Sequence, residues 1–380
     1  MRNLLQYFKS NVLNIPGWKT HRKIVVIESD DWGTIRTSSK KSLKKIQESF
    51  DIELNPYILN DSLESEDDLI ALFETIASIK NNLGQSPIIT ANSLVANPDF
   101  EKIEQSNFKH YHYENVTETF KNTNGSFNCI DLWKNGIHEN IFKPQFHGRE
   151  HLNVSLWMKL LQFDNLTKMM FEDKFWGIVK RGERDFVKKN SMAGCNYSSE
   201  NELKFLKKSI LEGLEIFESI LGYKSKSFIA NNYIWDEKIE EILKIKDVLY
   251  IQGQSFELYP AYKREIIKKN GKRNFLGAKN KFEQIYLTRN CFFEPFMDSS
   301  FNESISSCLK EVDYSFRWNR PAIISSHRVN YIGRLNENNR KVGLQKLKVL
   351  LESIIKKYPN VEFLSSDKLG DFIFKIGDNL

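Results

Sequence analysis

Residues 23–33, KIVVIESDDWG, decide the fold class of this chain of 380 residues. The run at 24–27 consists entirely of β-branched residues, and such an unbroken apolar run is typical of a strand covered on both faces of a parallel sheet. Three acidic residues, a Trp and a Gly follow directly. Because parallel α/β folds place functional groups at the carboxyl ends of their strands, this stretch predicts a central strand that ends at a functional site.

Further short apolar runs repeat this pattern along the chain. They lie at 87–91, 141–146, 227–230, 248–253, 322–326 and 361–365. Helical patterns with capping residues lie between them, at 64–84, 198–222, 236–246 and 337–359. Strands that alternate with helices indicate an α/β protein with a parallel sheet, and about seven such strands favour closure into a barrel.

The composition narrows the class of protein. Hydrophobic residues make up 41% of the chain and charged residues 27%, as is usual for a globular protein. The net charge of +6 is spread without a dense basic block, so we do not expect nucleic acid as a partner. We expect a cytoplasmic protein with reduced thiols, because the four cysteines form no C-x-x-C pair and neither a signal-peptide pattern nor a membrane-spanning run is visible.

The chain reads as one large domain behind a short extension. We expect residues 1–22 to form the N-terminal extension and residues 23–375 to form the barrel domain. The stretches near 100–140 and 165–200 are less regular and are interpreted as insertions between barrel elements. Long insertions in such folds often shape the substrate cleft.

Asp30 and Asp31 are the first candidates for chemistry. Adjacent carboxylates repel each other, so a positive group must accompany them or one of them must keep its proton. A divalent metal ion meets this requirement directly. An Asp-rich turn that caps the next helix explains the same residues equally well on this stretch alone.

A second candidate group is the stretch KPQFHGREHLN, which contains His147 and His151. On a helical turn these positions, four residues apart, face the same way, so both imidazoles can reach one metal ion. Two His and one Asp form a common catalytic metal set with open coordination positions. Glu150, inside the motif, faces elsewhere on such a helix and is interpreted as a surface or supporting group.

Other polar residues also follow strand-like runs. His327 ends one such run and is placed to act as a general acid or base, with a hydrogen-bonded structural histidine as the alternative. Asn231 and Asn232 follow another run, and Asn92 a third; each can bind substrate or orient a carboxylate. Trp32, beside the carboxylate pair, is a further candidate for substrate binding.

The order of these motifs resembles the polysaccharide deacetylase family, the NodB-homology carbohydrate esterases of the glycoside hydrolase/deacetylase superfamily. ESDDWG (28–33) looks like the family's Asp-Asp-Gly motif with one residue inserted before the Gly, HGREH (147–151) resembles its metal-binding pair, and IISSH (323–327) resembles its closing motif. The resemblance covers roughly residues 23–330 and implies a distorted (β/α) barrel of about seven parallel strands.

The resemblance also implies roles for individual residues. Asp31, His147 and His151 would be the ligands of a divalent metal, for which zinc is the expected ion. Asp30 would be the general base and His327 the general acid. The implied activity is metal-dependent removal of acetyl or other acyl groups from a carbohydrate, in the biosynthesis of a polysaccharide.

Two family motifs lack a match, which keeps other functions open. The family's Arg-Pro motif normally supports the base, but FIANNYIWD (228–236) occupies its place, and an Asp-Trp motif is not evident near 247–256. One alternative is a carboxylate-based glycoside hydrolase in which Glu28 or Glu294 supplies the second acid. The other alternative is a catalytically inactive barrel that only binds carbohydrate.

Overall fold

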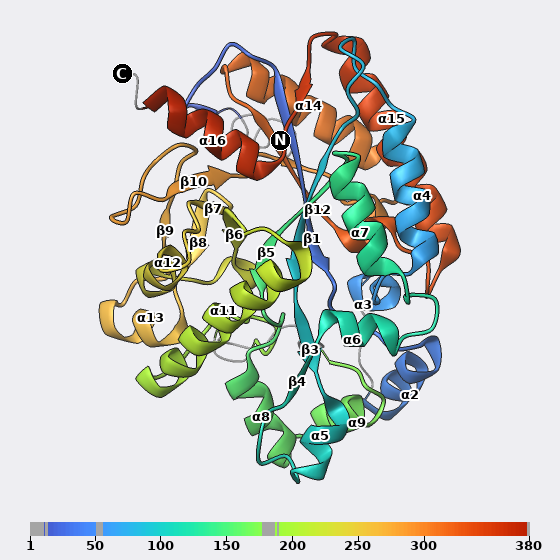
Figure 1. Cartoon of the computed structure of the whole chain (residues 1–380), viewed down its shortest axis with the longest axis vertical. Coiled ribbons are helices and arrows are strands. Elements are labelled where there is room, and N and C mark those ends of the chain that lie inside the picture. Colours follow the sequence, from blue (N-terminus) through green and yellow to red (C-terminus); the bar gives the residue numbers. More distant parts are fainter. Residues whose placement is uncertain (1–10, 12–13, 51–55, 177–186, 188–189, 378–380) are drawn as a thin grey trace.

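The computed structural model describes residues 11, 14–50, 56–176, 187 and 190–377, and its elements alternate between strands and helices (Figure 1). The strands are β1 (Ile24–Trp32), β2 (Ile89–Leu94), β3 (Ala96–Pro98), β4 (Tyr113–Asn115), β5 (Phe142–Gly148), β6 (Ser227–Ile229), β7 (Tyr250–Gly253), β8 (Phe256–Leu258), β9 (Gly271–Arg273), β10 (Ile285–Thr288), β11 (Cys291–Phe292), β12 (Ala322–His327) and β13 (Glu362–Phe363). The α-helices are α2 (Lys40–Phe50), α3 (Pro56–Asn60), α4 (Glu66–Ala77), α5 (Phe100–Gln105), α6 (Val116–Lys121), α7 (Cys129–His138), α8 (Val154–Phe163), α9 (Asn165–Glu172), α11 (Glu200–Leu221), α12 (Glu237–Lys244), α13 (Ala261–Ile267), α14 (Glu303–Arg317), α15 (Glu337–Lys357) and α16 (Ser366–Gly377). Short 3₁₀ turns follow three of the strands: η1 (Asn231–Tyr233), η2 (Pro295–Met297) and η3 (Arg328–Tyr331).

The main sheet has the strand order β10-β7-β6-β5-β2-β1-β12-β11, and its strand pairs are parallel. β13 pairs with the start of β1. This is the α/β fold that the sequence predicts, with the parallel sheet curled into a distorted barrel. The predicted strands are all present at or close to their expected positions.

One short segment, 285–292, joins the two edges of the sheet. Its first half, β10, pairs with β7, and its second half, β11, pairs with β12. Between them, the backbone N–H of Arg289 donates to Gly253 O at 2.8 Å, and that of Asn290 donates to Ile323 O at 3.1 Å. The sequence reading did not identify this segment, whose two strands are only four and two residues long.

The interior of the barrel has an apolar layer below a polar layer. Ile24 and Val26 of β1 pack in the apolar layer with residues of β7, β10, β12 and α16. Side chains two positions apart on a strand share a face, so Glu28 and Asp30 continue the same inward row into the polar layer. Both are buried, with 0% and 4% of their surface exposed. The site therefore lies directly above the floor of the barrel.

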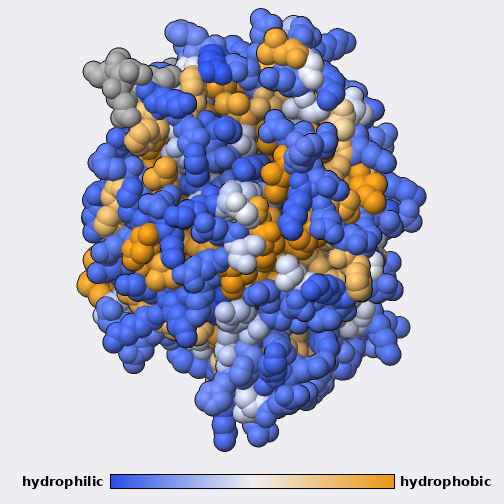
Figure 2. All heavy atoms as spheres, in the orientation of Figure 1, coloured by the Kyte–Doolittle hydropathy of each residue, from blue (hydrophilic) through white to orange (hydrophobic). Residues whose placement is uncertain are grey.

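The opposite face of β1 packs against helices. Val25 and Ile27 belong to a large apolar cluster to which α4, α14 and α15 contribute. Figure 1 shows these helices on one side of the sheet and α11 and α12 on another. On the face in view, polar side chains predominate and apolar ones gather mainly toward the middle (Figure 2).

Helix boundaries follow local capping chemistry. Ser199 caps α11, and Gly222 ends it with φ of 77°, as the sequence predicts. The helix expected over 64–84 is shorter and ends at Ala77. The side-chain oxygen of Asn81 accepts from the backbone N–H groups of Leu83 and Gln85, which stabilises a turn instead of a further helical turn.

Among the described residues, no helix is both long enough and apolar enough to cross a bilayer. The four cysteines, Cys129, Cys195, Cys291 and Cys308, are free and buried. The cytoplasmic location and the division into residues 1–22 and 23–375 remain predictions.

Candidate active site

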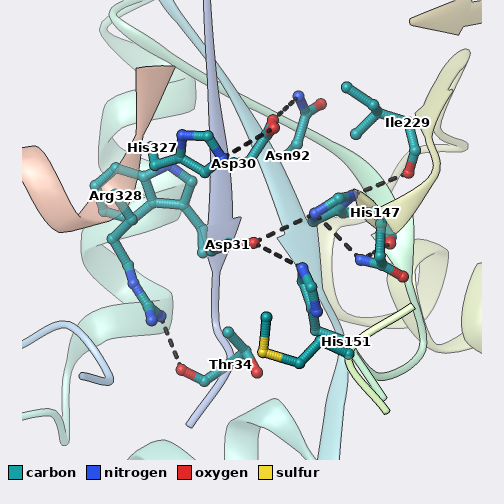
Figure 3. A network of polar contacts seen from close by, with 12 residues as sticks. Asp30, Asp31, Thr34, Asn92, His147, His151, Ile229, His327 and Arg328 are labelled. Carbon is teal, nitrogen blue, oxygen red and sulfur yellow. Dashed lines mark hydrogen bonds and ion pairs between the residues drawn. The ribbon is translucent and has the colours of Figure 1, made fainter. Parts of the chain in front are cut away.

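A pocket of about 430 Å³ opens at the carboxyl ends of the barrel strands. Its lining residues are Asp30, Asp31, Arg36, Thr37, Tyr57, Ile58, Asp61, His147, His151, Phe175, Trp176, Met192, Ala230, Asn232, Tyr233, Gln254, Phe292, Glu294, Ser325 and His327. The candidate carboxylates and imidazoles that the sequence singles out thus share one pocket. Figure 3 shows His147 and His151 directed toward Asp31, with Asp30 and His327 to one side.

A bulge in β1 separates the two carboxylates. The register between β1 and β2 shifts between Ser29 and Trp32, and Asp31 has φ of 78°. A non-glycine residue at positive φ is strained, and such strain collects at functional sites. The extra residue also reverses the inward and outward alternation of side chains, which explains why the sequence pattern misplaces Trp32.

Asp31, His147 and His151 form a buried group that could hold a metal ion. Asp31 Oδ1 lies 3.4 Å from His147 Nε2 and 3.2 Å from His151 Nε2. The three ligand atoms lie within 4.8 Å of one another, and the side chains are buried. Two imidazole nitrogens and one carboxylate oxygen around one point are a donor set that fits a divalent ion such as zinc.

The surroundings orient His147 and keep Asp31 and His151 in the forms that a metal requires. His147 Nδ1 lies 2.9 Å from Ile229 O, which directs Nε2 toward Asp31. Burial lowers the pKa of His151 to about 4, so this imidazole is neutral at neutral pH. Burial acts to raise the pKa of Asp31, but Arg36, with Nη2 2.9 Å from Oδ2, and His151 hold it well below its usual range.

The expected helical turn through His147 and His151 is wrong. His147 lies in β5, and His151 lies in the loop that leads to α8. The ring centroids are nevertheless 5.3 Å apart, because the chain turns back at Gly148 with φ of 125°. Glu150 is no metal ligand; it is buried and bonded to Arg149 and Tyr111.

Asp30 is held by a guanidinium. Arg289 Nη2 lies 2.6 Å from Asp30 Oδ1, and Nη1 lies 2.7 Å from Oδ2. Burial acts to raise the pKa of Asp30, but Arg289 outweighs it and the pKa is lowered, so Asp30 is a carboxylate at neutral pH. The same arginine bonds Glu28 through Nε at 2.6 Å.

Arg289 is an arginine that supports Asp30, although the Arg-Pro motif has no match in the sequence. It comes from the segment that closes the barrel, between β10 and β11, and not from FIANNYIWD (228–236), where the sequence reading sought it. Arg289 follows the apolar run IYLT, which is the same strand-end signal that identified the other candidates. The run was overlooked because it is only four residues long.

His327 lies next to Asp30 and a second carboxylate. Its Nε2 is 3.8 Å from Asp30 Oδ2, and its Nδ1 is 2.5 Å from Glu294 Oε1. Burial acts to lower the pKa of His327, but Glu294 and Asp30 raise it to about 10. Tyr57 contacts the same ring, with its hydroxyl 3.3 Å from Nδ1. His327 therefore carries a proton at neutral pH.

The structure corrects part of the expected substrate-binding set. Trp32 is fully buried in the apolar cluster outside the barrel, where it packs against Phe142 and bonds Ser29. Asn92 is buried below the pocket and donates to Asp30 Oδ1 at 2.7 Å, so it orients a carboxylate. Neither residue lines the pocket.

The two consecutive asparagines have different environments. Asn231 is buried, and its amide nitrogen lies 3.2 Å from His147 Nε2 and donates to His147 O at the same distance. It therefore contacts a candidate metal ligand instead of the open pocket. Asn232 lines the pocket and has a buried Oδ1 without a hydrogen-bond partner among the described residues. Only Asn232 keeps a position suited to substrate.

Further pocket residues come from loops that the sequence reading did not single out. Arg36 links Asp31 to Asp61, which is bonded to the buried Arg328. Figure 3 also shows Arg328 donating to Thr34 O, a bond of 2.8 Å. This chain of alternating charges fixes the loop after β1 under the site.

Only one of the two predicted insertions reaches the pocket. Phe175, Trp176 and Met192 belong to the stretch near 165–200 and line it. No residue of the stretch 100–140 lines it, and that stretch contains regular helices, including α5 and α7.

No protein-family model and no curated protein sequence matches the chain. Among solved structures, a protein of Parabacteroides distasonis described as a glycoside hydrolase/deacetylase has a TM-score of 0.49 and 8% identity, with coverage of 96% of this chain and 72% of the other. A CE4 family pseudoenzyme from Bacillus anthracis has a TM-score of 0.38 and 7% identity, with coverage of 92% and 65%. A Mycobacterium smegmatis protein assigned to the polysaccharide deacetylases has a TM-score of 0.44 and 8% identity, with coverage of 95% and 94%. Each of these three structures covers more than 90% of this chain.

Proposed function

We propose that the protein is a metal-dependent hydrolase that removes an acetyl or similar acyl group from a carbohydrate. The observation that carries the proposal is the combination within one pocket of three kinds of group. These are a buried Asp-His-His set, an ionised carboxylate paired with arginine, and a protonated imidazole. Hydrolysis of an amide or ester needs a general base and a general acid of this kind on either side of the reacting carbon.

Asp31, His147 and His151 would hold the metal, for which zinc is our first choice. A bound divalent ion supplies Lewis acidity, which polarises the acyl carbonyl and makes a water molecule more acidic. Asp30 would accept the proton of that water, and Arg289 would keep Asp30 ionised and in place. His327 would donate its proton to the leaving amine or alcohol, and Glu294 would keep the imidazole protonated.

Aromatic rings in the pocket support a carbohydrate substrate. Tyr57, Trp176, Tyr233 and Phe292 line it together with carboxylates and two side-chain amides. Sugar rings present apolar faces to aromatic side chains and hydroxyl groups to polar ones. Asn232, with its unpartnered buried oxygen, is our candidate for a hydrogen bond with a sugar or acyl N–H or O–H group.

A carboxylate-based glycoside hydrolase is the second candidate. Asp30 and Glu294 line the same pocket and both contact His327, so two carboxylates flank one imidazole. This function requires no metal. Release of reducing sugar that persists after chelation would favour it over deacylation.

The test combines metal content with acetate release. Wild type, His147→Ala and Asp30→Asn are purified side by side without added metal, and each is analysed by mass spectrometry and assayed on acetylated sugars. We expect near-stoichiometric metal in wild type and Asp30→Asn, and loss of metal in His147→Ala. Acetate release should require both the metal and Asp30. A wild-type protein that binds no zinc even after incubation, or full activity in Asp30→Asn, would refute the mechanism.

A further inference from the structure

Arg320 is buried without a counter-charge among the described residues. It precedes β12 and has 2% of its surface exposed. Its Nε and Nη1 atoms have no hydrogen-bond acceptor among the described residues. An isolated buried guanidinium is costly, and arginines in such positions are normally paired. The described part of the chain therefore leaves Arg320 in need of an acceptor.

Arg320 borders a separate pocket of about 250 Å³ on the outside of the barrel. The residues that line this pocket are Ile15, Pro16, Ser255, Arg273, Asn274, Phe275, Thr288 and Arg320. Thr288 faces outward, because Leu287 packs in the interior layer and adjacent strand residues face opposite ways. None of these residues lines the candidate active site. We call this cavity the Arg320 pocket.

The donors of the Arg320 pocket are not matched by acidic groups. Two arginines and the hydroxyl groups of Ser255 and Thr288 line it, and no carboxylate in the described part of the chain does. The carboxylate of Glu257 accepts from Asn274 and pairs with Lys272, so it is already engaged in the β8–β9 hairpin. Residues 1–27, which include Ile15, contain no Asp or Glu and therefore no carboxylate side chain.

Electrostatics and packing both point to a preformed site. Burial alone lowers the pKa of Arg320 to about 10, with no acidic neighbour to oppose it. Gly17, at φ of 98°, lies against the guanidinium, and a Cβ at this position would be 2.4 Å from Nη1. The backbone thus packs directly on the arginine and limits its movement, and this restrained side chain borders the pocket.

We propose that the Arg320 pocket binds an oxyanion, namely a phosphoryl group, through the guanidinium groups of Arg320 and Arg273. Arginine presents a planar fork of N–H donors that matches the oxygens of phosphate, and the two hydroxyls add neutral donors. The phosphoryl group can belong to free phosphate or to a phosphomonoester. The site is separate from the proposed hydrolase chemistry and does not depend on it.

The test measures thermal unfolding of the full chain in inorganic phosphate and in chloride at matched ionic strength. We expect a saturable rise of Tm with phosphate in the wild type, because a ligand of the folded state stabilises it. Arg273→Gln, at an exposed position, should weaken phosphate binding at least tenfold. Arg317→Gln, which removes the same charge from the exposed end of α14, should leave the response unchanged.

A second variant, at Arg320, distinguishes loss of phosphate binding from misfolding. Arg320→Met replaces the buried charge with an apolar chain of similar length, so it should fold without phosphate and lose the phosphate response. A parallel titration with glycerol phosphate distinguishes free phosphate from a phosphomonoester as the ligand. Binding of glycerol phosphate at least tenfold tighter than that of inorganic phosphate identifies a phosphomonoester. The absence of a saturable response in the wild type, or an equal response in wild type and Arg320→Met, would overturn the proposal.

Discussion

At the scale of the residue, Asp30 and Asp31 show how one bulge gives neighbouring carboxylates different partners. Asp30 belongs to the inward row of β1 and bonds Arg289, whereas Asp31, at positive φ, contacts His147, His151 and Arg36. The repulsion expected for adjacent carboxylates is thus relieved by two separate guanidinium groups. Neither carboxylate needs to keep a proton.

Arg289 bonds two buried acidic side chains, Glu28 and Asp30, and this makes a first prediction possible. Arg289→Met should lower the free energy of unfolding by about 3–5 kcal/mol, because breaking a buried pair leaves uncompensated charge. Urea unfolding measures the loss. Adding Glu28→Gln to this variant should restore part of the stability, whereas Arg317→Met, at an exposed site, should change it by less than about 0.5 kcal/mol. A loss below about 1 kcal/mol for Arg289→Met would contradict the assignment.

The pKa of His327 gives a second prediction. Burial acts to lower this pKa, and Glu294 and Asp30 raise it to about 10. Glu294→Gln removes the nearer carboxylate, so the imidazole should lose its proton at a lower pH. NMR titration of the ring should show this downward shift, and the alkaline limb of any activity profile should move the same way.

The sign of the stability effect follows from the same shift. The pKa of His327 is higher in the folded state than in the unfolded state. Protonated His327 therefore contributes fully to the free energy of unfolding below the unfolded pKa of about 6.5, and this contribution is lost as pH rises through about 10. The Glu294→Gln variant should lose this contribution at a lower pH. Glu139→Gln, at an exposed position, is the control, and an unchanged His327 titration in Glu294→Gln would refute the coupling.

At the scale of the element, α15 packs unusually close to the turn that follows His327. Gly343 of α15 lies against η3, and a Cβ at this position would be 1.7 Å from Asn330 O. Gly343→Ala should therefore push the helix away and lower the free energy of unfolding by about 1–3 kcal/mol or more, despite the better helix propensity of alanine. Urea unfolding tests this, with the exposed Glu352→Ala as control. A Gly343→Ala variant as stable as the wild type would show that α15 can shift without cost.

The elements also show which parts of the site could be predicted from sequence. Asp30, His147 and His327 were found because each follows a local apolar run that identifies a strand end, and barrel topology brings such ends together. Trp32 is predicted to bind substrate but is buried outside the barrel, because a bulge reverses the alternation of side chains. A simple inward–outward alternation does not predict such a bulge. Arg289 was missed because its strand is short and changes partner.

Hydrophobic periodicity does not predict which residues reach the pocket from loops and short helices. Arg36 and Glu294 reach the pocket from loops and Tyr57 from the short helix α3, and the paths of these segments depend on tertiary contacts. The strand before Glu294, β11, is only two residues long, and no strand-like apolar run directly precedes Arg36 or Tyr57. The sequence offers Glu294 as the acid of an alternative mechanism, and its contact with His327 gives it a different candidate role.

At the scale of the whole molecule, the candidate metal group links strands β1 and β5, which do not pair directly because β2 lies between them. A metal held by Asp31, His147 and His151 should therefore stabilise the barrel. Zinc at 100 times its dissociation constant should raise the free energy of unfolding by about 2.7 kcal/mol. Thermal unfolding with zinc and then with chelator measures the gain and its reversal.

Two histidine variants make the metal prediction specific. His151→Ala should lose the response to zinc. His138→Ala removes an exposed histidine at the end of α7 and should keep it. An equal response in both variants would place the zinc at another site.

The long sequence separation between Asp30 and Arg289 has a consequence for protein synthesis. Arg289 lies 259 residues after its partner Asp30, in the segment that joins the sheet edges. At about 5–20 residues per second, a ribosome needs roughly 13–52 s to advance from one to the other. During that interval the nascent chain contains Glu28 and Asp30 but not their partner Arg289. Strand β12, which pairs with β1, has also not been synthesised. Completion of the barrel must therefore wait until residues 285–327 have been made, and the partly made sheet must be kept from aggregating until then.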